Sequence, residues 1–222
     1  MKPRGAPVDR LATVLPARLV RGASVGLAMA WIWSQPGAWG HDLFTAFVQH
    51  RVQLVVGAQH ADVTLELTFF EDASEHEREH LDTNGNRRIS QAERESYLRR
   101  LAPAAEKLVR LKAGGRELPL TPLYSPRLDL LGSDEVGRGH HRLTLFFFAP
   151  TPRYLKPGDE FLIEDRLWPE ARALGSLEVE GRDGCRLEVL PRGDPVFPPA
   201  RDGEARVLKA RCLRPPEPKK PT

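Results

Sequence analysis

Apolar and polar residues alternate over the stretch from Phe44 to Phe69. Every second side chain is apolar in Phe44–Val56, apart from His50, and the alternation returns in Val63–Phe69. A period of two is typical of a β-strand with one buried face. Residues 57–60 separate the two runs, so the stretch predicts a β-hairpin with one face in the core.

The period changes after residue 70. Asp72–Glu75 resembles a helix start with Ser74 as its cap, and this helix is expected to run to Leu81. A second helix is expected over Ala92–Leu101, and Pro103 is expected to end or restart it. The apolar face of the second helix would consist of Tyr97, Leu98 and Leu101.

The remainder of the chain carries short strand signals separated by turn residues. A hairpin is expected around Gly114-Gly115, followed by a long loop with a short strand near Leu128–Leu131. Further strands are expected over His141–Ala149, Glu160–Asp165, Ser176–Glu180, Cys185–Leu190 and Ala205–Cys212. Short strands at this spacing indicate a β-sandwich or an open barrel. The predicted fold class is α+β, a mainly antiparallel β-sandwich-like domain with a helix–loop–helix inserted after its first hairpin.

Residues 1–40 have the pattern of an export signal. A basic leader is followed by an apolar run over Ala23–Trp33, and Ala38-Trp39-Gly40 offers a small-x-small cleavage site. The run is shorter than the ~20 apolar residues that a spanning helix needs. We therefore expect a signal peptide, a mature chain that begins near His41 without a transmembrane segment, and a location in the periplasm or outside the cell. An uncleaved membrane anchor is the alternative.

Removal of this leader changes the charge balance. The full chain has 33 Lys+Arg against 30 Asp+Glu, whereas the chain without the leader has 28 against 29. This balance gives no reason to expect a nucleic-acid partner. The remaining length fits one domain. Its expected parts are a first hairpin (41–70), the helix–loop–helix insert (71–106), the rest of the β-domain (107–213) and a Pro-rich disordered tail (214–222).

Cys185 and Cys212 are the two cysteines of the chain. An oxidising compartment would favour a disulfide between them, and two separate buried thiols are the alternative. Neither cysteine lies in a CxxC or Cys/His spacing typical of a zinc site.

The segment Asp82–Glu93 places oxygen-bearing side chains at regular intervals. Loop positions 1, 3, 5, 9 and 12 are Asp82, Asn84, Asn86, Ser90 and Glu93. Arg88, at position 7, would contribute its backbone carbonyl, and Ile89 would tie the loop to the core. Ca²⁺ takes roughly six to eight oxygen ligands, which a tight loop of this spacing delivers. In these residues the loop and its flanking helices resemble the EF-hand family, and the resemblance implies bound Ca²⁺. The alternative is a polar turn that binds no ion.

The loop departs from the EF-hand pattern at position 6, where Arg87 replaces the usual Gly. A side chain at positive φ costs on the order of 1 kcal/mol. Only Asp82 and Glu93 are negatively charged ligands, so we expect weak binding, with a Kd of about 10⁻⁴–10⁻³ M. The sequence contains no second calcium loop, although EF-hands usually pair. We expect the ion to act as a structural staple that holds the insert against the sheet.

The histidines offer two competing chemistries. His76-Glu77-Arg78-Glu79-His80 satisfies the HExxH motif, in which two histidines bind Zn²⁺ and the glutamate activates water. This helix has no apolar face apart from Leu81 and runs directly into the loop, so we favour a solvated helix and expect no enzyme. A nickel, cobalt or copper site is the other alternative. Its candidate ligands are His41, His50, His60, His140 and His141.

The order of these features resembles a loosely defined group of bacterial periplasmic domains. The group includes the exported front domains of permeases of the hydrogenase/urease-accessory type and periplasmic proteins encoded beside nickel or cobalt transporters. The shared features are a mature start at His41, the hairpin Phe44–Phe69, the loop Asp82–Glu93 and a β-rich remainder. The resemblance implies a membrane transporter or another envelope protein as partner, with transition-metal handling as the alternative function. Transport itself is not implied, because no membrane segments follow the β-domain.

Overall fold

The computed structural model describes residues 47–137, 139–192, 194–199 and 204–217. The predicted signal peptide, the mature start at His41, the end of the tail and the turn at 201–203 lie outside these residues. Among the residues that the structure describes, no helix is long and apolar enough to cross a membrane. The domain is rich in β-structure, with two mostly antiparallel sheets, as the sequence predicts.

The first sheet is built around the predicted hairpin. Its two strands pair antiparallel, from Val48 opposite Phe69 to Val56 opposite Ala61. The spatial order of the sheet is β11 (Val196–Phe197), β9 (Arg172–Gly181), β1 (Phe47–Val56), β2 (His60–Phe69), β7 (His140–Pro150) and β5 (Thr121–Pro122), and β6 (Arg127–Leu131) also pairs with β7. The β1–β9 pair is parallel, whereas the other pairs are antiparallel.

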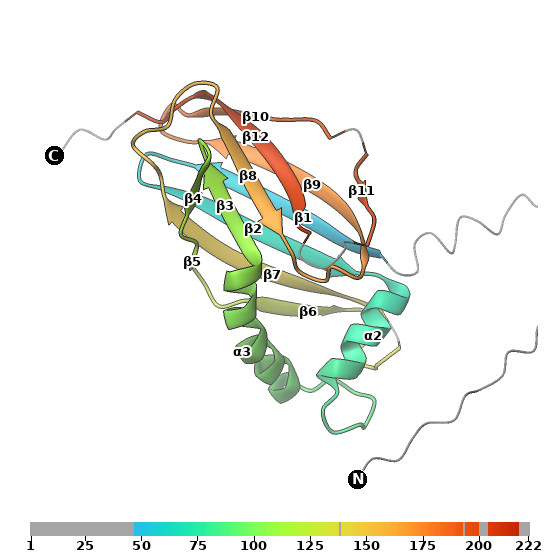
Figure 1. The fold of residues 1–222 in the computed structure, drawn as a ribbon. Helices are drawn as coiled ribbons and strands as arrows, with labels where there is room; N and C mark the ends of the chain where they lie inside the picture. Colours follow the sequence, from blue (N-terminus) through green and yellow to red (C-terminus); the bar gives the residue numbers. More distant parts are fainter. Residues whose placement is uncertain (1–46, 138, 193, 200–203, 218–222) are drawn as a thin grey trace, which may run out of the picture. The chain divides into compact units, whose positions relative to one another are not determined.

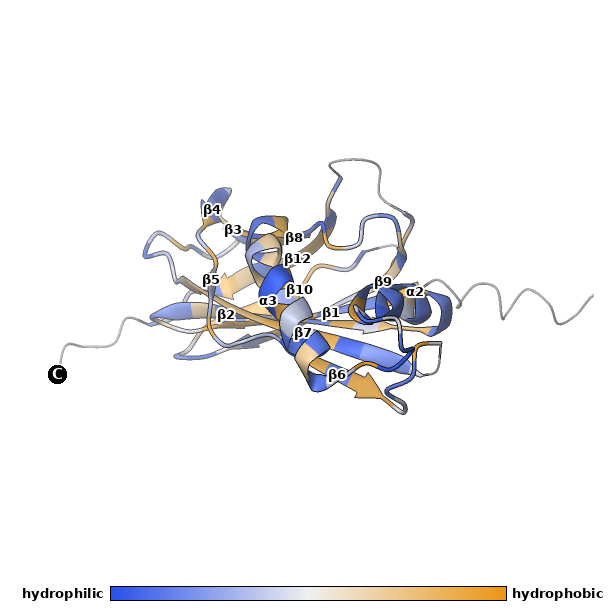
Figure 2. Cartoon of the chain, turned by 90° about the horizontal axis from the view of Figure 1, so that it is seen from below, coloured by the Kyte–Doolittle hydropathy of each residue, from blue (hydrophilic) through white to orange (hydrophobic). Residues whose placement is uncertain are grey.

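The second sheet is antiparallel throughout. Its order is β10 (Arg186–Val189), β12 (Arg206–Arg214), β8 (Glu160–Asp165), β3 (Val109–Ala113) and β4 (Arg116–Leu118). Figure 1 shows this sheet lying across the first one, and Figure 2 shows the two layers from another side. Buried side chains of both sheets, including Leu54, Leu65, Phe161 and Ile163, form one core cluster. Burial of these alternating apolar positions is the main source of stability for such a layered domain.

The histidine that interrupts the apolar row of β1 remains on the buried face. His50 is 1% exposed, and its Nδ1 is hydrogen-bonded to Oδ2 of Asp165, at the end of β8. The other carboxylate oxygen, Oδ1, accepts a hydrogen bond from the backbone N–H of Leu167 at 2.8 Å. A buried polar group is tolerated when it has such partners, which explains why the alternation of the strand continues through His50.

The helices correct two details of the sequence prediction. α2 (Glu71–Leu81) has Phe70 at its N-cap, so Ser74 is not the cap. Ser74 is instead buried, its hydroxyl donates to the carbonyl of Gly139 at 3.1 Å, and it lies 2.8 Å from Nδ1 of His141. The hydroxyl is thus satisfied by β7 and the residue before it rather than by its own helix.

Pro103 neither ends nor restarts the second helix, since α3 (Gln91–Leu108) continues through it. Proline removes one hydrogen-bond donor from a helix interior and clashes with the preceding turn. Pro103 and Arg99, four residues earlier, are both exposed, so water can satisfy the carbonyl that loses its partner. The predicted apolar face is present, because Tyr97 is buried and Leu98 and Leu101 pack against the core.

Candidate metal centre

The loop between α2 and α3 is anchored to the core at both ends. Leu81 closes α2 and is fully buried, and Ile89 precedes α3 and is 2% exposed. Between these two anchors the side chains are mostly exposed. The loop therefore has a fixed span, and its conformation depends on the polar groups within it.

Asp82 organises the first half of the loop. Its Oδ1 accepts hydrogen bonds from the backbone N–H groups of Gly85 at 2.9 Å and Asn86 at 3.2 Å. Its Oδ2 accepts one from the N–H of Arg87 at 2.7 Å. These three donors curl the chain around one carboxylate, so Asp82 faces the interior of the loop.

The two asparagines continue the same pattern at alternate positions. Oδ1 of Asn84 accepts from the N–H of Asn86 at 3.0 Å, and Oδ1 of Asn86 accepts from the N–H of Arg88 at 2.8 Å. Each asparagine thus forms an Asx turn with the residue two positions later. The turns direct the amide oxygens back onto the loop.

Glu93 closes the loop from the first turn of α3. Its Oε1 accepts from the N–H and hydroxyl of Thr83 at 2.9 and 3.1 Å and from the N–H of Asn84 at 3.3 Å. Its Oε2 accepts from the N–H and hydroxyl of Ser90, which is the N-cap of α3, at 2.9 and 2.8 Å. These hydrogen bonds, with those from Ser90 contributing most, lower the pKa of Glu93 to about 2.

The two arginines of the loop differ in backbone conformation and in side-chain contacts. Arg87 has a φ of +61°, in the left-handed region where Gly is usual. The side chain of Arg88 extends to the exposed carboxylate of Asp134, with Nη2 at 3.1 Å from both oxygens. The positive charge of Arg88 is thus paired with a residue of the β6–β7 connection rather than with a residue of the loop.

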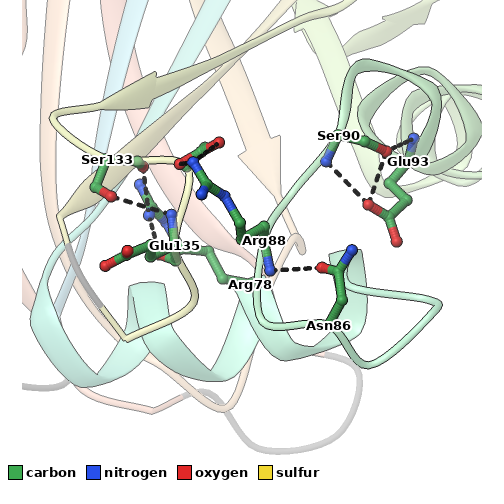
Figure 3. A network of polar contacts seen from close by, with 8 residues as sticks. Arg78, Asn86, Arg88, Ser90, Glu93, Ser133 and Glu135 are labelled. Atoms are coloured by element: carbon green, nitrogen blue, oxygen red, sulfur yellow. Dashed lines mark hydrogen bonds and ion pairs between the residues drawn. The ribbon is translucent and has the colours of Figure 1, made fainter.

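The loop also pairs with the connection between β6 and β7, which the sequence did not indicate. The N–H of Ile89 donates to the carbonyl of Asp134 at 2.8 Å, and the N–H of Val136 donates to the carbonyl of Arg87 at 3.0 Å. Arg78 of α2 holds the same connection through its guanidinium (Figure 3). No side-chain pattern signals a pairing of this kind, because both partners contribute backbone atoms.

The donor set of the loop fits a hard cation. It comprises carboxylate, amide and hydroxyl oxygens from Asp82, Asn84, Asn86, Ser90 and Glu93, together with the backbone carbonyl of Arg88. Oxygen donors of this kind suit Ca²⁺, whereas nitrogen and sulfur donors suit transition metals. Within the described part of the chain, no three or more His, Cys, Asp or Glu side chains cluster in a way that could hold a metal ion. A metal in this loop would therefore depend on the amide, hydroxyl and carbonyl oxygens.

Glu77 of the HExxH segment is engaged in structural contacts. Its Oε1 accepts from the hydroxyl of Tyr97, and its Oε2 accepts from the indole N–H of Trp168 at 3.0 Å. A general base needs a carboxylate that can reach and deprotonate a water molecule. Since both oxygens of Glu77 join α2 to α3 and to the β8–β9 connection, this geometry gives no support to the zinc-hydrolase alternative.

Among the described residues, the histidines considered for a transition metal form no cluster of three or more metal-binding side chains. His50 is buried against Asp165, and His141 is buried against Ser74 with its ring stacked on Phe69. Burial and the nearby Arg78 guanidinium lower the pKa of His141 to about 3. Exposed His60 lies 3.5 Å from Asp62 on β2. His41 lies outside the described residues.

The cysteines are both free thiols in the structure, and both are buried. Burial is the larger cause that raises the pKa of Cys185 to about 11, and the nearby Cys212 is the smaller one. Burial also raises the pKa of Cys212. The two thiols are close enough to influence one another, so the disulfide stays a prediction for the oxidised protein.

A comparison of the chain with models of known protein families finds no match. A search of curated proteins finds no matching relative either. The resemblance to EF-hand proteins and to periplasmic domains therefore rests on the residues quoted above.

Proposed function

We propose that the loop Asp82–Glu93 binds one Ca²⁺ ion as a single EF-hand, in an exported protein. Asp82, Asn84, Asn86, Ser90 and Glu93 supply side-chain oxygens, and Arg88 supplies its backbone carbonyl. The bound ion fixes the angle between α2 and α3. Because affinity is low and extracellular calcium is plentiful, the ion acts as a staple rather than as a switch.

One observation carries this proposal. The oxygens of the two ends of the loop are directed at its own backbone, with three N–H groups around Asp82 and the N–H groups of Thr83, Asn84 and Ser90 around Glu93. A loop arranged in advance around its two carboxylates loses little conformational entropy when a cation enters.

Calorimetric titration of the chain with CaCl₂ tests the proposal. We expect one site with a Kd of about 10⁻⁴–10⁻³ M. The double variant Asp82→Ala, Glu93→Gln is expected to lose the binding heat, since it removes both negative ligands. Glu95→Gln is the matched control, because it removes an exposed carboxylate of α3 outside the loop and should bind as the wild type does. Equal binding by the double variant and the wild type would refute the proposed site.

A transition-metal function is the second candidate, and a different pair of histidines favours it. The exposed rings of His76 and His80 lie on one face of α2 with their centroids 4.8 Å apart. Nδ1 of His80 donates to the carbonyl of His76 at 2.9 Å, which leaves Nε2 as the metal-binding atom. Titration with NiCl₂ tests this candidate. Binding that persists in a His76→Ala, His80→Ala variant would eliminate the pair as ligands.

A further inference from the structure

The connection between β6 and β7 contacts the loop through backbone atoms. We define the pairing segment as Ser133–Gly137. The Ile89 N–H and the Asp134 carbonyl form one hydrogen bond, the Val136 N–H and the Arg87 carbonyl form the other, and together they make an antiparallel bridge between Arg88 and Glu135. This bridge adds a short second strand to the middle of the loop.

The bridge is packed as well as hydrogen-bonded. Ile89 is 2% exposed and Val136 is 5% exposed, and both belong to the core cluster. Burial of these flanking side chains protects the two backbone hydrogen bonds from competition by water. The pairing segment is therefore part of the folded domain rather than a surface loop that touches the site by chance.

Arg78 fixes the pairing segment to the helix that enters the loop. Its side chain is fully buried, and Nη1 donates to the carbonyls of Ser133 at 2.9 Å and Glu135 at 2.8 Å. Nη2 donates to the carbonyl of His140, and the backbone carbonyl of Arg78 accepts from the N–H of Asp82 at 3.0 Å. Figure 3 shows Arg78 beside Ser133 and Glu135, with the loop residues on the other side. Burial lowers the pKa of this guanidinium, and the carbonyl dipoles around it compensate for lost hydration.

We propose that the pairing segment is the internal partner of the calcium loop and that Arg78 is the positioning residue that holds it there. This inference rests on the proposed calcium function. The backbone edge of the loop, which a second calcium loop would otherwise cover, is covered by the chain itself. The site consequently binds Ca²⁺ in a monomer, and its affinity depends on Arg78, although Arg78 contributes no oxygen to the ion.

The physical reason is preorganisation. The bridge holds the backbone of Arg87–Ile89, which includes the Arg88 carbonyl, in one conformation before the ion arrives. Without Arg78 the carbonyls of Ser133, Glu135 and His140 lose their shared donor, and the pairing segment can leave the loop. Binding then has to restore the order of both segments, which weakens affinity.

Calorimetric titration of Arg78→Met with CaCl₂ tests this proposal. Methionine fills much of the apolar part of the side chain and removes the donors. We expect the Kd to rise about tenfold, within the range of coupling between linked sites. Arg99→Met is the matched control, because it removes an exposed arginine of α3 and should leave the Kd unchanged. Val136→Pro, which deletes the N–H that donates to Arg87, provides a second variant in case Arg78→Met fails to fold.

The outcomes separate the two proposals. Wild-type binding with unchanged Kd values in Arg78→Met and Val136→Pro would overturn the role of the pairing segment and leave the calcium site standing. Absence of Ca²⁺ binding in the wild type would overturn the calcium function and this inference with it. Light scattering of the wild type with and without CaCl₂ gives an independent measurement. A Ca²⁺-dependent dimer that Val136→Pro leaves intact would show that the loop finds its partner in a second chain.

Discussion

Glu93 illustrates how much of the loop depends on one residue. It belongs to α3 and caps that helix together with Ser90, yet it also accepts hydrogen bonds from Thr83 and Asn84 at the opposite end of the loop. The sequence motif predicts its position as the last ligand. The reciprocal capping box with Ser90 is also readable from the sequence, since Ser followed three residues later by Glu is a helix-start signal.

The lowered pKa of Glu93 predicts a pH dependence in calcium-free buffer. The folded-state pKa is about 2 and the ordinary value is 4.5, so the unfolded chain takes up a proton first as the pH falls. The stability that ionised Glu93 contributes is complete above about pH 4.5 and is lost between pH 4.5 and 2. Melting temperatures of the wild type and Glu93→Gln should therefore differ most above pH 4.5 and converge towards pH 2. A constant difference across this range would contradict the assignment.

At the scale of elements, the sequence predicts structure well where side chains alternate and poorly where pairing is distant. β8 spans the predicted residues Glu160–Asp165, because its alternation and its turns are local signals. β9 begins at Arg172 rather than at Ser176, and the strand pairs in parallel with β1 along its whole length, from Arg172 to Gly181. The local sequence pattern predicts neither this parallel pair nor the pairing segment. In both cases the contacts join backbone atoms of residues that lie far apart in the chain.

Pro103 is expected to destabilise α3. It lies inside α3 on the exposed side, where it removes a donor without adding a buried contact. Pro103→Ala should raise the free energy of unfolding by about 1–2 kcal/mol, since the restored hydrogen bond outweighs the gain in unfolded-chain entropy. Urea unfolding measures the change. A decrease in the free energy of unfolding of Pro103→Ala would contradict the expectation that Pro103 destabilises α3.

At the scale of the whole molecule, a polar contact crosses the core between the two sheets. His50 belongs to β1 of the first sheet, and Asp165 ends β8 of the second. Arg206 of β12 lies nearby and donates to the carbonyls of Leu167, Trp168 and Ala171, which form the turn after β8. Apolar packing brings the sheets together without fixing their register, whereas this directional contact works only when β1 and β8 are correctly aligned.

Asp165→Ala is therefore expected to destabilise the domain far more than loss of a surface ion pair does. It leaves His50 buried without its carboxylate partner and removes a negative charge near buried Arg206. Loss of one member of a buried pair typically costs about 3–5 kcal/mol. Glu178→Ala is the matched control, because it breaks the ion pair between Arg51 of β1 and Glu178 of β9, whose side chains are both 52% exposed. Such exposed pairs contribute about 0–1 kcal/mol. Urea unfolding of both variants measures the two costs. Equal costs would mean that apolar packing alone aligns the sheets, and the alignment of His50 with Asp165 would then be a consequence of the fold rather than one of its causes.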